Sequence, residues 1–351
     1  MTIYASPATT PTSTRWSEQI LAIVLLLAVF YRGWSAPLPA VETWKDLRAG
    51  QMLTQTGPWT SSIGSGWLGQ VLIYQTFHHA GLAGLAILFG VITTAKTGLY
   101  LAAFRRLGLS LPPAVLGILG MEATRWATFG PLRPLAFAEL CWAMILYIGS
   151  ASRVTRIDMV LVVAALGFWT NLHPSVPLAL LFLGAKLFDC AIRELRAGRN
   201  LTTLFQSREV QQWLAMVLFA LIGTCLTPRV HRLILDDLRA AQFAVTGGVL
   251  ESQAINLPMI GGNGFFASLL VTLLVLRWSR RSFTLAEVGL LLYFGLGAWL
   301  TPGFVFWWAT IWPLMLLPHV ETISCVQSLK CKRRGFSSLT LQALSDRQIS
   351  N

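Results

Sequence analysis

Charged residues are scarce in this 351-residue chain. Lys and Arg total 27 and Asp and Glu total 15, so charged residues make up 12% of the chain while hydrophobic residues reach 54%. A soluble globular domain carries about 25% charged residues. The shortage excludes an ordinary soluble domain and indicates an all-α, polytopic integral membrane protein.

Several signatures of catalysis and cofactor binding are also missing. The glycine-rich stretches lack a P-loop lysine, no serine sits in a nucleophile elbow, and the five cysteines show no metal-ligand spacing. Cys141, Cys190 and Cys225 lie in or beside apolar runs, where a small buried hydrophobe is the ordinary role. No metal ligand is assigned, and the question of a divalent metal cofactor stays open.

The net charge of +12 would suit a nucleic-acid partner, but the positions of the basic residues argue against one. Lys and Arg cluster in short loops between apolar runs, as membrane topology requires, rather than along one basic face. We therefore expect contacts with membrane lipids and none with nucleic acid.

Apolar runs predict about ten transmembrane helices in one domain over residues 18–320. Residues 1–17 are rich in Thr, Ser and Pro and are expected to be disordered, and residues 321–351 are expected to form a basic cytoplasmic tail. With both termini inside, every basic connection falls inside, and the long polar segments 35–81 and 227–264 fall outside. The runs cover residues 20–31, 82–104, 111–128, 135–148, 159–169, 177–188, 213–226, 265–276, 285–300 and 304–317.

The first run, Ile20 to Tyr31, has two interpretations. Its length and the residues that follow it suit a cleaved signal peptide, whereas continuation through Gly33-Trp34 suits a first spanning helix. Arg32 and Trp34 are typical of a helix end at the membrane interface, which favours the spanning helix.

The polar segment 41–81 holds the most suggestive acids. If residues 44–54 form a helix, Glu42 and Asp46 stand four residues apart and share one face of a short helix lying at the membrane surface. The apolar run 67–78 is too short to span a bilayer, so we expect it to re-enter or to lie flat.

Ionisable residues predicted on the outer side would meet at one membrane face in a compact bundle. The acids of the first outer segment, with Arg133, His173, Arg229 and His231, suit a phosphate-bearing ligand, because guanidinium groups bind phosphate bidentately and a carboxylate can act as general base. The alternative is that these residues pair with one another and with lipid headgroups. Within the spans, Lys96 and Glu139 are unusual for their depth, and a pair between them is a further hypothesis.

Four motifs occur in a distinctive order. They are Glu42-Thr43-Trp44-Lys45-Asp46-Leu47-Arg48-Ala49-Gly50, Pro58-Trp59 followed by Trp67-Leu68-Gly69-Gln70, Arg133-Pro134, and Trp169-Thr170-Asn171-Leu172-His173. In this order they resemble bacterial multi-pass membrane proteins related to the type C glycosyltransferases. The resemblance implies transfer of a sugar from a polyprenyl-phosphate donor at the outer face of the cytoplasmic (inner) membrane.

The resemblance implies a catalytic base at Glu42 or Asp46. Under this hypothesis the residues already identified as suited to phosphate, Arg133, His173, Arg229 and His231, surround the donor phosphate. The chain also departs from the family pattern, since Ser65-Gly66 replaces a His-Glu pair and Asp46 replaces a His. These departures motivate an alternative: a non-catalytic accessory or lipid-binding subunit of the same fold, held by a membrane-protein partner.

Overall fold

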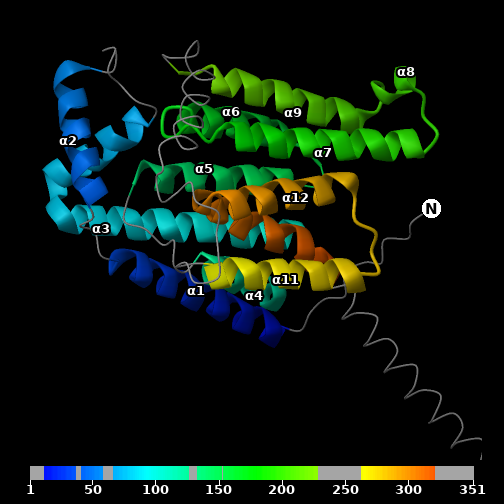
Figure 1. The fold of residues 1–351 in the computed structure, drawn as a ribbon, viewed down its shortest axis with the longest axis horizontal. Coiled ribbons are helices and arrows are strands. Elements are labelled where there is room, and N and C mark those ends of the chain that lie inside the picture. The colour runs from blue at the N-terminus through cyan, green and yellow to red at the C-terminus, as the bar shows by residue number, and fades with distance from the viewer. Residues whose placement is uncertain are drawn as a thin grey trace, which may run out of the picture. The chain divides into compact units, whose positions relative to one another are not determined.

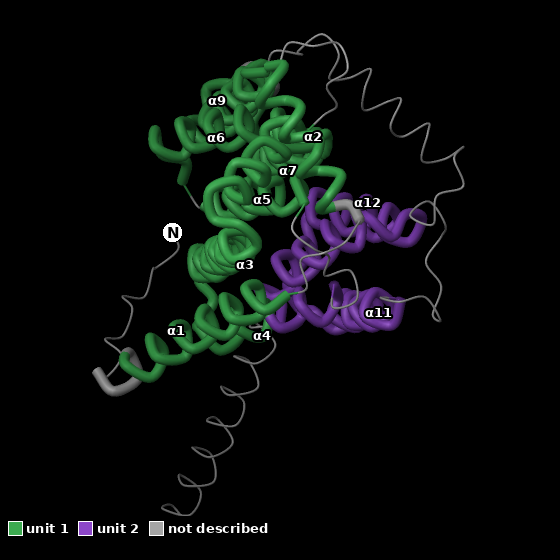
Figure 2. The backbone as a smooth tube through the Cα atoms, turned by 90° about the vertical axis from the view of Figure 1, so that its left-hand side faces the viewer, with its two compact units in different colours: residues 1–118, 129–252 green, residues 119–128, 253–351 purple. Residues whose placement is uncertain are grey.

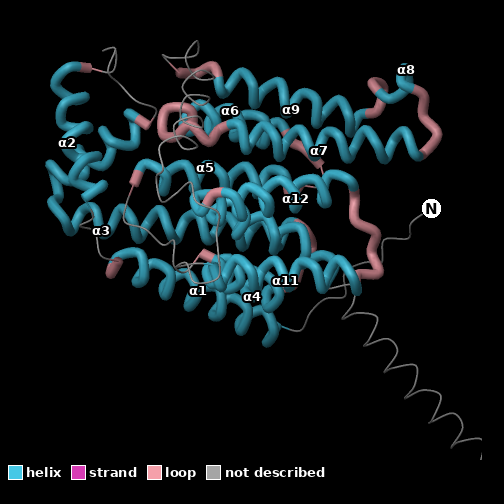
Figure 3. The backbone as a smooth tube through the Cα atoms, viewed as in Figure 1, coloured by secondary structure: helices cyan, strands magenta, loops and turns pink. Residues whose placement is uncertain are grey.

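The computed structural model describes residues 12–36, 41–57, 66–125, 133–151, 153–227 and 262–320. Within these ranges the chain is all-helical, and the helices are joined by turns and loops without a strand (Figure 1, Figure 3). The helices are α1 (Thr12–Trp34), α2 (Val41–Thr56), α3 (Trp67–Arg106), α4 (Leu111–Thr124), α5 (Pro134–Gly149), α6 (Arg156–Trp169), α7 (Pro177–Arg196), α8 (Leu201–Leu204), α9 (Arg208–Thr224), α11 (Gly262–Trp278), α12 (Leu285–Leu300) and the 3-10 turn η3 (Pro302–Phe304), which leads into a last helix ending at Val320.

The chain divides into two compact units, coloured separately in Figure 2. The first unit comprises residues 1–118 and 129–252, and the second comprises residues 119–128 and 253–351. Helix α4 contributes its first residues to the first unit and its last residues to the second. The motifs from Glu42 to His173 all belong to the first unit, which therefore holds the candidate site.

Helix α3 is the centre of the first unit, where α1, α2 and α5 all contact it. Its backbone breaks at Gly81, which has φ 60° and ψ −156°, a conformation that side-chain-bearing residues rarely adopt. The break separates a short arm that begins at Trp67 from a long arm that ends at Arg106. This confirms the predicted division between the apolar run 67–78 and the span 82–104.

Helix α1 crosses the long arm of α3 through two glycines. A Cβ added to Gly33 would lie 3.0 Å from the Cα of Gly90, and one added to Gly90 would lie 3.0 Å from the ring of Phe30. The helix begins at Thr12, inside the segment expected to be disordered, and continues through Gly33-Trp34. This continuation is what the spanning-helix interpretation of the first run requires.

Of the remaining helices of the first unit, α9 contacts both α6 and α7, and α5 connects α6 and α7 to α3. The Trp142 ring lies edge-on to Trp169 at 6.1 Å and to Phe182 at 5.7 Å, and all three side chains are buried. Helix α9 approaches α6 closely, because a Cβ on Gly223 would lie 2.9 Å from the Val163 carbonyl oxygen. Burial of large aromatic side chains joins α5, α6 and α7 into one core.

The second unit has a core of its own around Trp308. The Trp308 indole N–H donates to the Ser268 hydroxyl at 2.7 Å, and Phe265 lies 6.1 Å from its ring. Gly264 lies so close to the end of α4 that an added Cβ would be 2.7 Å from the Ala123 carbonyl oxygen. Close backbone approach and a buried hydrogen bond hold this unit together.

Three described helices are long and apolar enough to cross a membrane: Trp16–Trp34, Trp67–Arg106 and Pro302–Val320. The prediction of about ten spans is therefore wrong by this measure for the described part of the chain. Helices α4, α5, α11 and α12 are apolar but have only 14 to 17 residues, a rise of about 21–26 Å against the roughly 30 Å of a hydrocarbon core. Helix α7 has 20 residues, but its second half carries four charged residues and is therefore too polar to count as a membrane span: Asp189, Arg193, Glu194 and Arg196.

Candidate functional site

In the polar segment that was predicted to lie outside, α2 lies against the short arm of α3. Leu47 and Leu53 are buried in this contact, and Gly50 approaches so closely that an added Cβ would be 2.2 Å from the Gln70 carbonyl oxygen. The Gln70 side-chain amide donates to Asp46 Oδ1 at 3.2 Å. The close approach at Gly50 thus positions one of the two predicted acids, Asp46, beside α3.

Helix α3 begins on the hairpin between α6 and α7. The Trp67 indole N–H donates to Asn171 Oδ1 at 3.1 Å, and the Leu68 backbone N–H donates to the Asn171 carbonyl oxygen, also at 3.1 Å. Gly66 precedes the helix with φ 100°, and a Cβ there would lie 2.8 Å from the Leu172 carbonyl oxygen. Two motifs about a hundred residues apart in the chain are thereby in direct contact.

Asn171 connects a third element to this junction. Its side-chain NH2 donates to the Gly167 carbonyl oxygen at 2.7 Å and to the Leu226 carbonyl oxygen at 2.9 Å, just beyond the end of α9. The residue is only 7% exposed, so a lost hydrogen bond here would leave a buried polar group without its partner. Asn171 therefore holds the starts or ends of α3, α6 and α9 in one arrangement.

The Arg133-Pro134 motif lies against the same arm of α3. Pro134 is the first residue of α5, and a Cβ on Gly69 would lie 2.8 Å from the Pro134 Cβ. Arg133 is the N-cap residue, half-buried and extended, with φ −132° and ψ 163°. The cationic side chain of Arg133 and the positive end of the α5 dipole are therefore at the same place, and both favour an anion there.

His173 is held in one tautomer by the turn that follows it. The Ser175 backbone N–H donates to His173 Nδ1 at 3.2 Å, and the Ser175 hydroxyl lies 2.8 Å from the same nitrogen. Because Nδ1 accepts a backbone hydrogen bond, the neutral ring carries its proton on Nε2. Burial lowers the pKa of His173 from its ordinary value of 6.5 to about 4, so the ring is neutral at pH 7.

The predicted site residues fall into two groups. Asp46, Arg133 and His173 are connected through Gln70, Gly69 and Asn171 at one end of the first unit. Glu42 lies in α2 with Asp46, but its side chain is outside the described residues, as are Arg229 and His231.

Trp67, Gln70 and Asn171 had no predicted role, although each stands in a quoted motif. The signal that could have singled them out is a polar or amphipathic side chain at the border of an apolar run, where its hydrogen-bonding groups need partners. Among the described residues no group of three or more His, Cys, Asp or Glu side chains could hold a metal ion.

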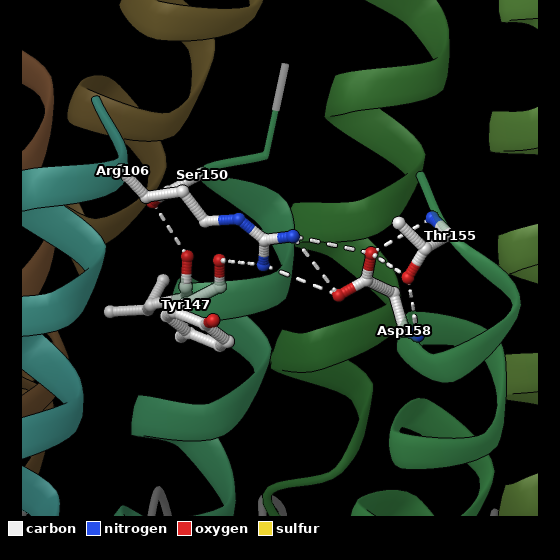
Figure 4. Close-up of polar contacts among 6 residues, drawn as sticks. Arg106, Tyr147, Ser150, Thr155 and Asp158 are labelled. Atoms are coloured by element: carbon white, nitrogen blue, oxygen red, sulfur yellow. Dashed lines mark hydrogen bonds and ion pairs between the residues drawn. The ribbon is translucent and has the colours of Figure 1, made fainter. Parts of the chain in front are cut away.

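The opposite end of the first unit is joined by charge (Figure 4). Both Nη atoms of Arg106, at the end of α3, donate to Asp158 at 3.2–3.3 Å, and Nη1 also donates to the Tyr147 carbonyl oxygen at 3.2 Å. Asp158 is 3% exposed and forms a reciprocal cap with Thr155 at the start of α6. The predicted pair between Lys96 and Glu139 is confirmed, and it joins α3 to α5.

No protein-family profile and no curated protein matches the chain.

Proposed function

We propose that the end of the first unit with Asp46, Arg133 and His173 binds the phosphate of a polyprenyl-phosphate sugar donor. We further propose that the protein transfers the sugar at the outer face of the cytoplasmic membrane. The observation that carries the proposal is the convergence of the described parts of the four motifs through direct contacts: Asp46 with Gln70, Gly69 with Pro134, and Trp67 and Leu68 with Asn171.

Each residue has a chemical role in this proposal. Arg133 and the positive end of α5 would bind the donor phosphate, and neutral His173 would donate from Nε2. Asp46 or Glu42 would take the proton from an acceptor hydroxyl as its oxygen bonds to the anomeric carbon. The bond from that carbon to the phosphate oxygen breaks, and the polyprenyl phosphate leaves with the electron pair.

The membrane arrangement belongs to this proposal. The described segments that the charge rule assigned to one side lie at one end of the first unit: Asp46 and Gln70, Arg133, and the hairpin of Asn171 and His173. The other end holds Arg106 and its partner Asp158 at the start of α6. The ion pair between Arg193 and Glu209 joins the last turns of α7 to the first turn of α9.

A second candidate is a non-catalytic lipid-binding or accessory subunit. It is favoured by Gly66, which stands where the resembled family has a Glu and whose close approach to Leu172 leaves no room for a side chain. In this case the phosphate contacts would persist without a base.

One experiment separates the two candidates. The protein in lipid nanodiscs is titrated with a polyprenyl phosphate, and a polyprenyl-phosphate sugar is then supplied with membrane extract as acceptor. Transfer that is lost in Asp46→Asn or Glu42→Gln, with binding retained, supports the enzyme. Binding that needs Arg133, without transfer, supports the accessory subunit. No binding by the wild-type protein would sink both.

The acid variants have a matched control. Asp189→Asn removes a carboxylate that pairs with Arg193 in the second half of α7, away from the His173 turn at its start, and it should leave both binding and transfer unchanged.

A further inference from the structure

A buried ion pair lies between α3 and α5, away from the candidate site. Lys96 Nζ donates to Glu139 Oε2, and the two side chains are only 3% and 6% exposed. Each residue lies ten positions before the end of its helix, Arg106 for α3 and Gly149 for α5. At about 1.5 Å per residue each residue is about 15 Å from that end, inside an apolar helix, where ionisable groups are costly.

Stability alone does not explain a charged pair at this depth. Replacing a buried ion pair by apolar residues of similar volume is often neutral or stabilising. The neighbouring hydroxyls act within their own helix, since Thr93 donates to the Phe89 carbonyl oxygen at 2.7 Å and Thr97 donates to the Thr93 carbonyl oxygen at 2.8 Å. A cross-helix ion pair adds specificity, because its hydrogen bonds form in only one register and rotation of the two helices.

The pair is placed to act on the candidate site through α5. Pro134, the first residue of α5, contacts Gly69, and Glu139 follows five residues later. Arg133 directly precedes Pro134. Because a helix transmits rotation and translation over so short a length, the register set at Glu139 is also the register of Arg133.

We infer that Lys96 and Glu139 form a positioning pair that sets α5 on α3 and thereby fixes the position of Arg133, next to the contact between Pro134 and Gly69. The identity of the ligand that Arg133 binds rests on the proposed function. The positioning itself does not, and it can be tested without a ligand.

The first measurement is the rate at which a membrane-impermeant maleimide labels Arg133→Cys, in a background with the five native cysteines replaced by alanine. Trp44→Cys, at the half-exposed Trp44 on α2, is the control site at the same end of the unit. Glu139→Gln and Lys96→Met should each change the rate at position 133 several-fold and leave the rate at position 44 unchanged.

Two double variants separate positioning from folding. Lys96→Met with Glu139→Leu keeps an apolar contact, so it should melt near the wild-type temperature yet still show the altered rate at position 133. The exchange Lys96→Glu with Glu139→Lys should restore the wild-type rate. Wild-type labelling in the apolar double variant, or a rate that changes only when the protein melts, would overturn the inference.

Polyprenyl phosphate binding by the same variants, with Arg133 intact, completes the test. We expect weaker binding in the apolar double variant and recovery in the exchanged pair. If the wild-type protein binds no polyprenyl phosphate, the proposed function fails while the labelling rates still decide the positioning role.

Discussion

The two ends of the first unit are joined by different chemistry. At one end, Arg106 donates from both Nη atoms to buried Asp158, which also caps α6 (Figure 4). At the other end, Trp67 and Asn171 connect three elements through neutral hydrogen bonds, and Gly69 lets α5 approach α3.

The difference teaches which charges have a structural explanation. Asp158 serves a helix cap, a salt bridge and a helix junction at once, so the fold explains why an acid is present at this position. At the opposite end, neutral groups make most of the connections between segments. The ionisable residues that they bring together there, Asp46, Arg133 and His173, are therefore the better candidates for function.

The largest effect should come from removing the charged junction. Asp158→Ala leaves the Arg106 guanidinium without its carboxylate and α6 without its reciprocal cap, and we expect a loss of about 3 kcal/mol of unfolding free energy. Thermal melting in detergent measures it. Glu18→Ala removes the exposed partner of Arg105 and should cost less than about 1 kcal/mol. Equal losses in the two variants would contradict the comparison.

Removing the neutral junction should cost less stability but more function. Asn171→Leu leaves the Trp67 N–H and the carbonyl oxygens of Gly167 and Leu226 without this partner, a loss of about 2 kcal/mol. Polyprenyl phosphate binding should fall in this variant even at temperatures where it is fully folded, whereas folded Asp158→Ala should still bind. Normal binding by folded Asn171→Leu would show that the junction does not organise the site.

Two glycines of α3 allow a comparison between a crowded position and an open one. Gly69→Ala forces a Cβ against Pro134 and should destabilise the protein by about 1 kcal/mol, whereas Gly98 has open space and Gly98→Ala should stabilise it by up to about 1 kcal/mol. Melting temperatures of the two variants should therefore move in opposite directions. A shift in the same direction would mean that α5 moves aside at little cost.

The smallest effect should come from acid. The pKa of His173 is lowered to about 4 in the folded protein, so the unfolded chain binds the proton more tightly. Keeping His173 neutral in the folded state therefore costs no stability well above pH 6.5. The free energy of unfolding falls as the pH drops from there toward 4, and the loss is about 1 kcal/mol at pH 6. His173→Gln should flatten the melting temperature between pH 7.5 and 6. An unchanged slope would mean that another group causes the dependence.

Helix positions could be predicted from the sequence wherever apolar runs met turn residues. The run 285–300 coincides with α12, the run 135–148 lies within α5, and the break before residue 82 falls at Gly81. Spanning character was less predictable. A run of 14 to 17 apolar residues looks the same whether it crosses a membrane or packs inside a helical unit.

The candidate site was predicted unevenly for a similar reason. Asp46, Arg133 and His173 stood out because ionisable residues are rare in this chain. Gln70 and Asn171 did not, because an uncharged amide between apolar runs is common, and only its partners show that it joins segments.

What the sequence determined by itself is the helical class, most helix boundaries and the depth of Lys96 and Glu139, because these depend on local hydrophobicity and on residues near one another in the chain. Tertiary structure alone decided that Lys96 meets Glu139, that Asn171 binds Trp67 and the end of α9, and that Gly69 receives Pro134. These contacts join residues 43 to 104 positions apart, and they depend on how helices rotate and cross. Hydrophobic periodicity constrains that geometry only to a face, whereas hydrogen bonds and close contacts select a single register.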